Sequence, residues 1–342
     1  MKIAFYDTKP YDKLWMTTLS SEYKYEIKYF EHKLNADTAK SAAGYDVVCV
    51  FVNDTVNKEV IETLYNSGIK LIALRCAGYN NVDFKAAYKK LNVVRVPSYS
   101  PAATAEHAAA LMLSLNRKIH RAYARTRDNN FSIDGLMGFD LHGKTAGVVG
   151  TGKIGRIFID ICKGFGMKVI AYDPYPAKDS GIDYVELNDL FKQADIISLH
   201  CPLTPETKHI INAETLALLQ SHALIINTSR GGLIKTHALV EALKSRNIGG
   251  AGLDVYEEEE EYFFEDLSNE ILVDDDLARL LSFPNVLITS HQGFFTEEAM
   301  QAIAKTTMSN INAFDKEETL INEICYRCGD MCKKKEGQKR CF

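Results

Sequence analysis

GVVGTGKIG, the stretch Gly147–Gly155, decides the fold of this chain. It places G-x-G-x-x-G between an apolar run and an amphipathic one, which is where a strand would turn into a helix. Gly150 permits the tight turn, Gly152 lets the backbone approach a pyrophosphate, and Gly155 lets the helix pack closely on the strand. The unpaired N–H groups and positive dipole end of the helix N-terminus would then bind the phosphates. The stretch therefore predicts a dinucleotide-binding Rossmann unit.

Asp173 supports this prediction and indicates which dinucleotide is bound. It ends the next apolar run, Lys168–Tyr172, at about the 20-residue spacing that such sites use. A carboxylate at that strand end would bind the ribose hydroxyls of the adenosine and repel a 2′-phosphate. No Arg or Lys follows within residues 174–177 to receive a phosphate. The expected cofactor is therefore NAD and not NADP; the alternative is a glycine-rich turn with an incidental aspartate.

Length and composition restrict the classes of protein that remain. The 342 residues are enough for two domains with a core each. The chain is 46% hydrophobic and 25% charged, as in soluble globular proteins, and its net charge of −5 argues against nucleic acid or an anionic membrane as the main partner. No apolar run reaches the length of about 18 residues that a membrane helix needs. Because residues 1–7 meet a charge too early for a signal peptide, we expect a cytoplasmic protein with no membrane partner.

The eight cysteines fall into two groups. Four lie in apolar runs and are expected to be reduced core thiols, namely Cys49, Cys76, Cys162 and Cys201. Four others lie among lysines and arginines near the end of the chain, namely Cys325, Cys328, Cys332 and Cys341. Their spacing could bind zinc. No histidine or apolar framework accompanies them, so a disordered basic tail is favoured and no metal is expected.

Apolar runs alternate with amphipathic runs along the chain, which predicts βαβ units and parallel sheets. Before the glycine motif the expected strands are 2–6, 25–30, 47–52, 70–74 and 93–96, and the expected helices are 58–65 and 84–90. After it the expected strands are 168–172, 196–199, 224–227, 250–253 and 286–289, and the expected helices are 154–165, 187–192 and 237–245. A final helix over 297–314 should return to the first domain.

One long helix is expected over Pro101–Arg127, with Ser100 as a cap and the proline at its first position. His107 on this helix is expected to be a packing or hydrogen-bonded histidine and not a ligand. Because a helix this long and apolar often packs against another subunit, we expect a homo-oligomer, either a dimer or a tetramer.

Polar residues follow the strands that come after the glycine motif. In an open parallel sheet, ligands bind outside the carboxyl ends of the strands, so these residues are expected in one crevice. Arg230 could clamp a carboxylate through two parallel hydrogen bonds, and His291 could exchange a proton near neutral pH. A glutamate of the acidic run could hold that histidine charged and oriented; in an extended segment Glu257, Glu259 and Glu261 share one face, which leaves three candidates. Beside a dinucleotide, this set suits hydride transfer to a 2-oxo acid.

The chain resembles the D-isomer-specific 2-hydroxyacid dehydrogenases, and among them the bacterial fermentative D-lactate dehydrogenases. The resemblance runs from Met1 to about Asn322 and excludes the tail. The motifs that carry it are LRCAGYNNVD (74–83), RVPSYSPAATAEH (95–107), GVVGTGKIG (147–155), HCPLTPET (200–207), NTSRGG (227–232), GLDVYEEEEE (252–261) and HQGFFT (291–296).

The resemblance implies an α/β fold of two Rossmann- or flavodoxin-like parallel-sheet domains. The NAD-binding domain (100–296) would be inserted in the substrate domain (1–99 and 297–342), with hinges near 98–101 and 293–296. In the catalytic set, Arg230 would bind the substrate carboxylate and polarise its carbonyl, His291 would be the acid–base, and Glu259 would be its partner.

The resemblance also implies the binding residues. The substrate would contact the backbone of Ala77 and Gly78, the side chains of Tyr99 and Phe294, and the catalytic Arg230 and His291. The cofactor would be bound by Gly150, Gly152, Lys153, Ile154, Gly155, Asp173, Cys201, Pro202, Thr207, Thr228, Ser229, Arg230 and Asp254.

The implied activity is the NADH-dependent reduction of pyruvate to D-lactate. Three alternatives remain from the sequence. The substrate could be a larger 2-oxo acid, the chain could be an NAD-sensing module without turnover, or the tail could form a metal-binding module. The complete set of arginine, glutamate and histidine argues against a sensor, which needs no acid–base pair.

Overall fold

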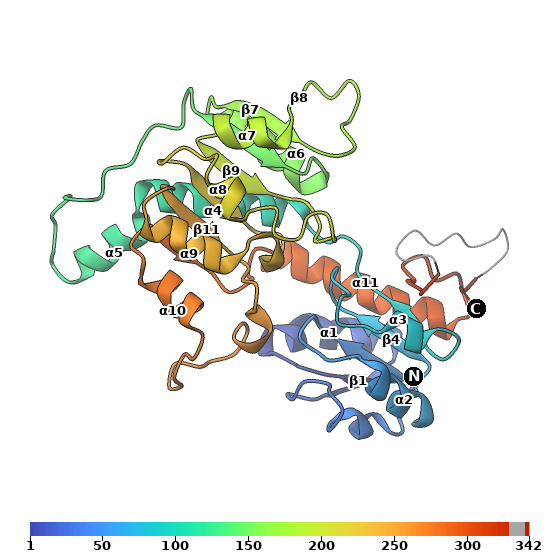
Figure 1. Cartoon of the computed structure of the whole chain (residues 1–342). Helices are drawn as coiled ribbons and strands as arrows, with labels where there is room; N and C mark the ends of the chain where they lie inside the picture. Colours follow the sequence, from blue (N-terminus) through green and yellow to red (C-terminus); the bar gives the residue numbers. More distant parts are fainter. Residues whose placement is uncertain (328–338, 342) are drawn as a thin grey trace. The chain divides into compact units, whose positions relative to one another are not determined.

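The computed structural model describes residues 1–327 and 339–341, and the chain divides into two compact units (Figure 1). The terminal unit comprises Met1–Ser100 and Thr296–Phe342, and the central unit comprises Pro101–Phe295. Each unit is built on one sheet in which every strand pair is parallel. The expected fold class, two parallel-sheet α/β domains with one inserted in the other, is confirmed.

The terminal sheet has the strand order β2-β1-β3-β4-β5. Its strands are β1 (Lys2–Phe5), β2 (Glu26–Tyr29), β3 (Val47–Val50), β4 (Leu71–Leu74) and β5 (Asn92–Val94). Successive residues face opposite sides of the sheet. Ala4 and Val48 belong to the core on one face, whereas Ile3 and Phe5 belong to the core on the other.

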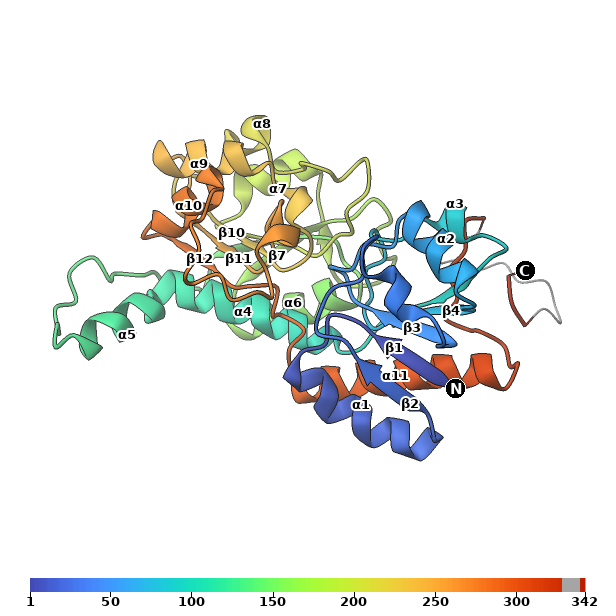
Figure 2. The same ribbon diagram turned by 90° about the horizontal axis from the view of Figure 1, so that it is seen from below.

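Helices cover both faces of the terminal sheet. They are α1 (Pro10–Tyr23), α2 (Lys58–Asn66), α3 (Phe84–Ala87), α11 (Glu297–Asp315) and the 3₁₀ helix η1 (Ala39–Ala42). Figure 2 shows α1 and α11 side by side on the same face, where Met16 and Met308 share one core. The sequence missed α1 because few of its residues are apolar and buried. The expected helix over 84–90 is too long, because α3 ends at Ala87, where Tyr88 leaves the helical backbone conformation (ψ 126°).

The central sheet has the strand order β12-β11-β10-β9-β6-β7-β8. Its strands are β6 (Thr145–Val149), β7 (Lys168–Tyr172), β8 (Asp183–Tyr184), β9 (Ile196–Leu199), β10 (Leu224–Asn227), β11 (Gly250–Leu253) and β12 (Val286–Ile288). The chain adds β7 on one side of β6 and β9 on the other. The glycine motif, which follows β6, therefore lies at the topological switch point where such sheets bind ligands.

Helices also cover both faces of the central sheet. One face carries α4 (Pro101–Arg117) and α6 (Lys153–Gly164), and the other carries α7 (Leu187–Gln193), α8 (Ala213–Leu216), α9 (Thr236–Lys244) and α10 (Asp275–Ser282). Two 3₁₀ helices, η2 (Gly231–Leu233) and η3 (Glu259–Glu261), follow β10 and β11.

The prediction of one helix over Pro101–Arg127 is wrong. Lys118 adopts a left-handed backbone (φ 51°), so α4 ends at Arg117 and α5 (Ile119–Arg127) begins in a new direction. The side chain of Asn116 accepts from the N–H of Phe139 at 2.9 Å and donates to its carbonyl at 2.8 Å. These bonds dock the later segment on the end of α4, a contact that no local sequence pattern encodes.

The exposed apolar surface of this region lies on α5 and not on α4. The apolar face of α4 is buried against its own sheet. Figure 1 shows α5 and the segment after it extending away from the central sheet. Their exposed apolar side chains are Ile119, Tyr123, Phe131, Ile133 and Met137.

The first group of cysteines is buried and unbridged, as expected. Burial raises the pKa of the Cys49 and Cys162 thiols to about 12 and that of Cys201 to about 11. No helix within residues 1–327 and 339–341 is long and apolar enough to cross a membrane.

The expected disordered tail is wrong for the part of it that the structure describes. Glu323 bridges Val94 in antiparallel fashion, and Cys325 beyond it is buried. The N–H of Cys341 donates to Glu323 Oε2 at 2.8 Å. Cys328 and Cys332 lie outside the residues that the structure describes. Among the described residues, no group of three metal-ligating side chains occurs.

Candidate active site

The glycine motif forms a close turn between β6 and α6. A Cβ on Gly150 (φ 94°) would lie 2.7 Å from the carbonyl carbon of His200, and a Cβ on Gly155 would lie 2.0 Å from the Gly150 oxygen. A Cβ on Gly152, the N-cap of α6, would meet nothing within 4 Å, and no side chain caps that helix. The N–H groups at the start of α6, including those of Lys153 and Ile154, are therefore open to an anionic group. This arrangement fits a dinucleotide pyrophosphate.

Asp173 follows β7 and is tied to the glycine turn. Its Oδ2 accepts from the backbone N–H and the hydroxyl of Thr151 at 2.8 and 2.9 Å, and its Oδ1 accepts from Tyr175 N at 2.9 Å. Burial alone would raise the pKa of this carboxyl, but these hydrogen bonds and the nearby Arg156 hold it below its usual range. An ionised carboxylate thus stands at the second strand end, where a ribose would be bound.

Side-chain hydrogen bonds hold the segments that follow β9 and β10. Ser229 Oγ donates to the Cys201 carbonyl at 2.6 Å, and Thr207 Oγ1 donates to the Pro202 carbonyl at 2.6 Å. Within the described part of the chain, Thr228 Oγ1 is buried and has no hydrogen-bond partner. Since buried hydroxyls are normally paired, this atom fits a site where a cofactor completes the bonding.

A tight turn after β10 carries Arg230. Asn227 closes it, accepting from Ser229 N at 3.0 Å and donating to the Arg230 carbonyl at 2.9 Å. The half-buried guanidinium of Arg230 donates from Nη1 to the Ser229 carbonyl at 2.7 Å. A Cβ on Gly231 would lie 2.0 Å from the carbonyl group of Tyr256. Glycine therefore lets this turn pack against the backbone that leads into the acidic run.

His291 and Glu259 form a hydrogen-bonded pair. His291 Nδ1 lies 2.7 Å from Glu259 Oε1, and Glu259 Oε2 accepts from Tyr256 N at 3.0 Å. The two side chains are 19% and 17% exposed. The extended segment assumed for the acidic run is wrong, because Glu259 lies in η3. The side chain of Glu257 pairs with a different histidine; its Oε1 lies 2.5 Å from His209 Nε2.

Asp254 holds the segment around His291. Its carboxylate accepts from Thr289 Oγ1 at 2.6 Å, from Gln292 N at 2.9 Å and from Gly293 N at 2.7 Å. Burial would raise the pKa of Asp254, but hydrogen bonds from His107 and Thr289 lower it below its usual range. The N–H of His291 donates to the Asp254 carbonyl at 2.7 Å. This bond stabilises the left-handed backbone of His291 (φ 52°), a conformation that is uncommon for residues other than glycine.

His107 is hydrogen-bonded, as expected, with Nε2 3.0 Å from Thr289 Oγ1 and 3.1 Å from Asp254 Oδ1. The sequence did not predict Thr289 or these two contacts. His107 is the last residue of the motif at 95–107, one of those that carry the resemblance. That position was the sequence signal from which its place in the site could have been inferred.

In the terminal unit, the loop after β4 presents backbone N–H groups. The carbonyl of Cys76 accepts from Val96 N at 3.1 Å, and that of Ala77 accepts from Arg95 Nη1 at 2.8 Å. Because the C=O and N–H of a trans peptide point in opposite directions, the N–H groups of Ala77 and Gly78 point away from β5. Among the described residues these two N–H groups have no hydrogen-bond partner.

The remaining predicted side chains divide between the units. Tyr99, after β5, is half-buried in the terminal unit, and Phe294 is buried in the central unit with its ring 6.1 Å from that of Phe295. The terminal unit thus holds Ala77, Gly78 and Tyr99, and the central unit holds every other predicted site residue.

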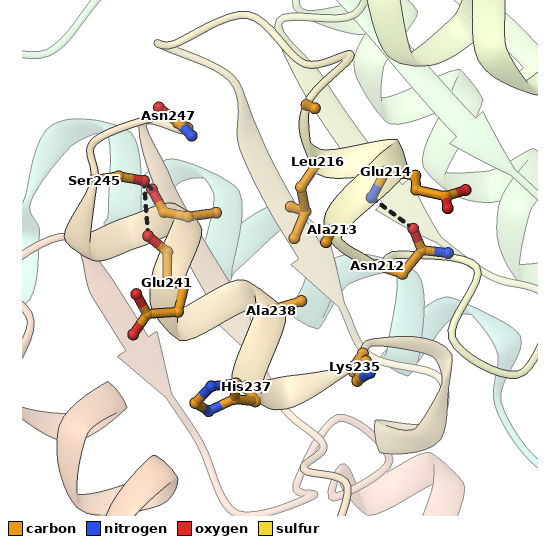
Figure 3. Close-up of a pocket in the computed structure, with 12 residues that line it drawn as sticks. Asn212, Ala213, Glu214, Leu216, Lys235, His237, Ala238, Glu241, Ser245 and Asn247 are labelled. Carbon is orange, nitrogen blue, oxygen red and sulfur yellow. Dashed lines mark hydrogen bonds between the residues drawn. The ribbon is translucent and has the colours of Figure 1, made fainter.

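A cavity of about 630 Å³ lies elsewhere in the central unit, between α8 and α9 (Figure 3). Two of its polar side chains make local bonds: Asn212 accepts from Glu214 N at 2.9 Å, and Ser245 donates to the Glu241 carbonyl at 2.7 Å. None of the predicted site residues lines this cavity.

The fold and the site define a class. A glycine turn at a switch point, with a carboxylate on the next strand, is a dinucleotide-binding Rossmann domain. Residues 109–293 match the family model for the D-isomer specific 2-hydroxyacid dehydrogenase, NAD binding domain. The chain belongs to the D-isomer-specific 2-hydroxyacid dehydrogenase family. It is therefore an NAD-dependent dehydrogenase.

Named dehydrogenases are similar in sequence and structure to nearly the whole chain. The D-lactate dehydrogenase of Escherichia coli K12 is 51% identical over 95% of this chain and 100% of its own length. The apo structure of a D-lactate dehydrogenase from Escherichia coli superposes with a TM-score of 0.87 at 49% identity, covering 94% of this chain and 99% of that one. The Salmonella D-lactate dehydrogenase structure gives a TM-score of 0.84 at 51% identity, with 94% and 99% covered. A D-2-hydroxyisocaproate dehydrogenase structure gives 0.82 at 34% identity, with 95% and 99% covered.

Proposed function

We propose that this enzyme reduces pyruvate to D-lactate with NADH, in a reversible reaction. The observation that carries the proposal is the pairing of His291 with Glu259, in the same unit as Arg230, on a chain that is 51% identical to a D-lactate dehydrogenase. The reaction needs a carboxylate anchor and a proton donor beside the nicotinamide. The three side chains supply both.

Arg230 is the proposed anchor of the substrate carboxylate. A guanidinium can make two parallel hydrogen bonds to a carboxylate and still polarise the neighbouring carbonyl. The turn closed by Asn227 fixes its backbone, and the bond from Nη1 to the Ser229 carbonyl orients its side chain. The N–H groups of Ala77 and Gly78 would bind the same carboxylate, Tyr99 would line the substrate site, and Phe294 would contact the methyl group.

His291 is the proposed acid–base. Since Nδ1 faces Glu259, Nε2 is the nitrogen that would give its proton to the substrate oxygen. The Glu259 carboxylate stabilises the charged imidazole and holds the ring in one orientation. When bound, the reduced nicotinamide would supply the hydride that C2 of the substrate accepts. In the reverse direction, neutral His291 would take the proton of the hydroxyl group.

The proposed cofactor contacts follow the strand ends of the central unit. Lys153 and Ile154 would meet the pyrophosphate and Asp173 the ribose. Cys201, Pro202 and Thr207 would lie along the adenosine, and Thr228, Ser229, Arg230 and Asp254 would face the nicotinamide.

A larger 2-oxo acid is the second candidate substrate. The 34% identity with a D-2-hydroxyisocaproate dehydrogenase favours it, although less than the relatives that are D-lactate dehydrogenases favour pyruvate. A panel of pyruvate, phenylpyruvate, 2-oxoisocaproate, glyoxylate and hydroxypyruvate, each with NADH, separates the two. We expect pyruvate to give the highest kcat/KM and chiral analysis to find D-lactate. No turnover of any acid would indicate an NAD-sensing module, and L-lactate as main product would contradict the proposal.

The proposal includes a homo-oligomer, a dimer or a tetramer, in the cytoplasm. The support for self-association is the exposed apolar surface of α5 and the segment after it, where Ile133 is 81% and Met137 87% exposed. Light scattering on the parent and on Ile133→Lys tests it, since a charge there should shift the mass towards the monomer. A parent that is already monomeric would contradict it. The free thiols suit a reducing compartment.

A further inference from the structure

We infer that Arg95 is a positioning residue for the substrate carboxylate, acting through the loop Cys76–Tyr79. This inference rests on the proposed function, which gives that loop a carboxylate to bind. Arg95 follows β5, and its side chain reaches the loop after β4.

Arg95 holds the loop on both sides of Gly78. Its Nη1 donates to the Ala77 carbonyl at 2.8 Å, and its guanidinium lies over the Tyr79 ring, 5.0 Å from the centroid. Both contacts suit a planar cation, which can donate in its plane and stack with its face. The Sγ of Cys76 also bonds the Gly78 carbonyl, at 3.2 Å. The loop is therefore fixed at three successive residues.

The bond to Ala77 decides where the next N–H points. The Ala77 carbonyl and the Gly78 N–H belong to one planar trans peptide, so fixing the oxygen on Arg95 aims the N–H in the opposite direction. A charged donor on the carbonyl also polarises the peptide, which makes the Gly78 N–H a stronger donor. Arg95 thus both orients and strengthens a group that binds the carboxylate, without touching the substrate.

The C-terminal part of the terminal unit holds Arg95 itself. Its N–H donates to the Asn322 carbonyl at 3.1 Å, and its carbonyl accepts from Asn310 Nδ2 at 2.8 Å. Asn322 Nδ2 in turn bonds Asn310 Oδ1 at 2.8 Å. Two segments that carry none of the predicted site residues therefore determine the position of the loop. One is α11, which carries Asn310, and the other is the strand-like segment around Asn322.

Arg340 provides a matched control in the same unit. It makes the same two kinds of contact, donating from Nη2 to the Phe314 carbonyl at 3.1 Å and lying 4.3 Å from the centroid of the Phe314 ring. Arg340→Gln should thus lose a carbonyl bond and a ring contact, as Arg95→Gln does, but none of the contacts to the substrate loop. A general effect of losing such contacts would appear in both variants.

The test compares steady-state kinetics of the parent, Arg95→Gln, Arg95→Lys and Arg340→Gln, with the best acid of the 2-oxo acid panel. For Arg95→Gln we expect KM to rise about tenfold, with kcat within about threefold of the parent, because the loss falls on binding. Arg95→Lys should recover part of the KM, since it keeps a charged donor but not the planar face. The inhibition constant of oxamate, a carboxylate analogue of the substrate, should shift as KM does, and the Kd of NADH should not change.

The inference is overturned if Arg95→Gln changes KM no more than Arg340→Gln does, or if kcat and the affinity for NADH both fall while KM rises. Should Arg95→Gln fail to fold, Arg95→Lys decides between the same outcomes. A parent that turns over none of the acids contradicts the proposed function as well, whereas an active parent with an unaffected Arg95→Gln contradicts only the inference.

Discussion

Replacing Glu259 by glutamine tests the proposed acid–base pair most directly. Both carboxylate oxygens accept a hydrogen bond, Oε1 at 2.7 Å from His291 Nδ1 and Oε2 at 3.0 Å from Tyr256 N. An amide has a single oxygen, so glutamine can satisfy only one of these donors. It also removes the negative charge that stabilises the imidazole when it is charged. The variant should therefore lose both the orientation and the charge stabilisation of His291.

The expected loss of activity follows from the hydrogen bond between Glu259 and His291. A hydrogen bond to a charged group contributes about 1.5–3 kcal/mol, which corresponds to a fall of roughly 10- to 100-fold in kcat/KM for pyruvate. The affinity for NADH should stay unchanged, because Glu259 is not among the proposed cofactor contacts. The assay is the loss of NADH absorbance on adding pyruvate, combined with urea unfolding to measure the stability of each variant.

Glu257 gives the matched control. Its carboxylate also uses both oxygens, 2.5 Å from His209 Nε2 and 3.1 Å from Thr236 N, so Glu257→Gln loses an acceptor in the same way. The two variants should lose similar stability, but Glu257→Gln should keep kcat/KM within about threefold of the parent. The reasoning is refuted if Glu257→Gln loses as much activity as Glu259→Gln, or if Glu259→Gln matches the parent.

Three further predictions concern other sites. Arg230→Lys should lower kcat/KM on the order of 100-fold, because an ammonium cannot reproduce the bidentate clamp; a loss under about threefold would mean that Arg230 is not the anchor. Asp173→Ala should raise kcat/KM with NADPH relative to NADH, since the carboxylate repels a 2′-phosphate, and an unchanged ratio would contradict this. Burial raises the pKa of Asp54 from 3.8 to about 6, so the native state binds this proton more tightly than the unfolded chain does. Its contribution to stability is therefore lost as pH rises from about 4 to about 6, by about 1.4 kcal/mol per pH unit, and Asp54→Asn should flatten that slope in urea unfolding.

The sequence by itself determined the class of fold and the kind of cofactor, NAD. The glycine turn needs residues without a side chain at fixed positions, and Asp173 stands at a fixed distance beyond it. Parallel strands end at one edge of a sheet, so apolar runs followed by Arg230 and by His291 already indicated a shared site. The prediction of the fold class held because it depends on local backbone geometry and on the periodicity of single segments, whereas the shared site of Arg230 and His291 stays a prediction.

Only the tertiary structure decided which side chains meet. Glu259 was chosen by resemblance; its contact with His291 depends on the short helix η3 and on how β11 and β12 pair. The break at Lys118 depends on Asn116 binding Phe139, and the position of Glu323 depends on its bridge to Val94 at the edge of β5. These contacts join residues far apart in the chain. Their geometry follows from strand register and from the packing of whole elements, which no local pattern of residues encodes.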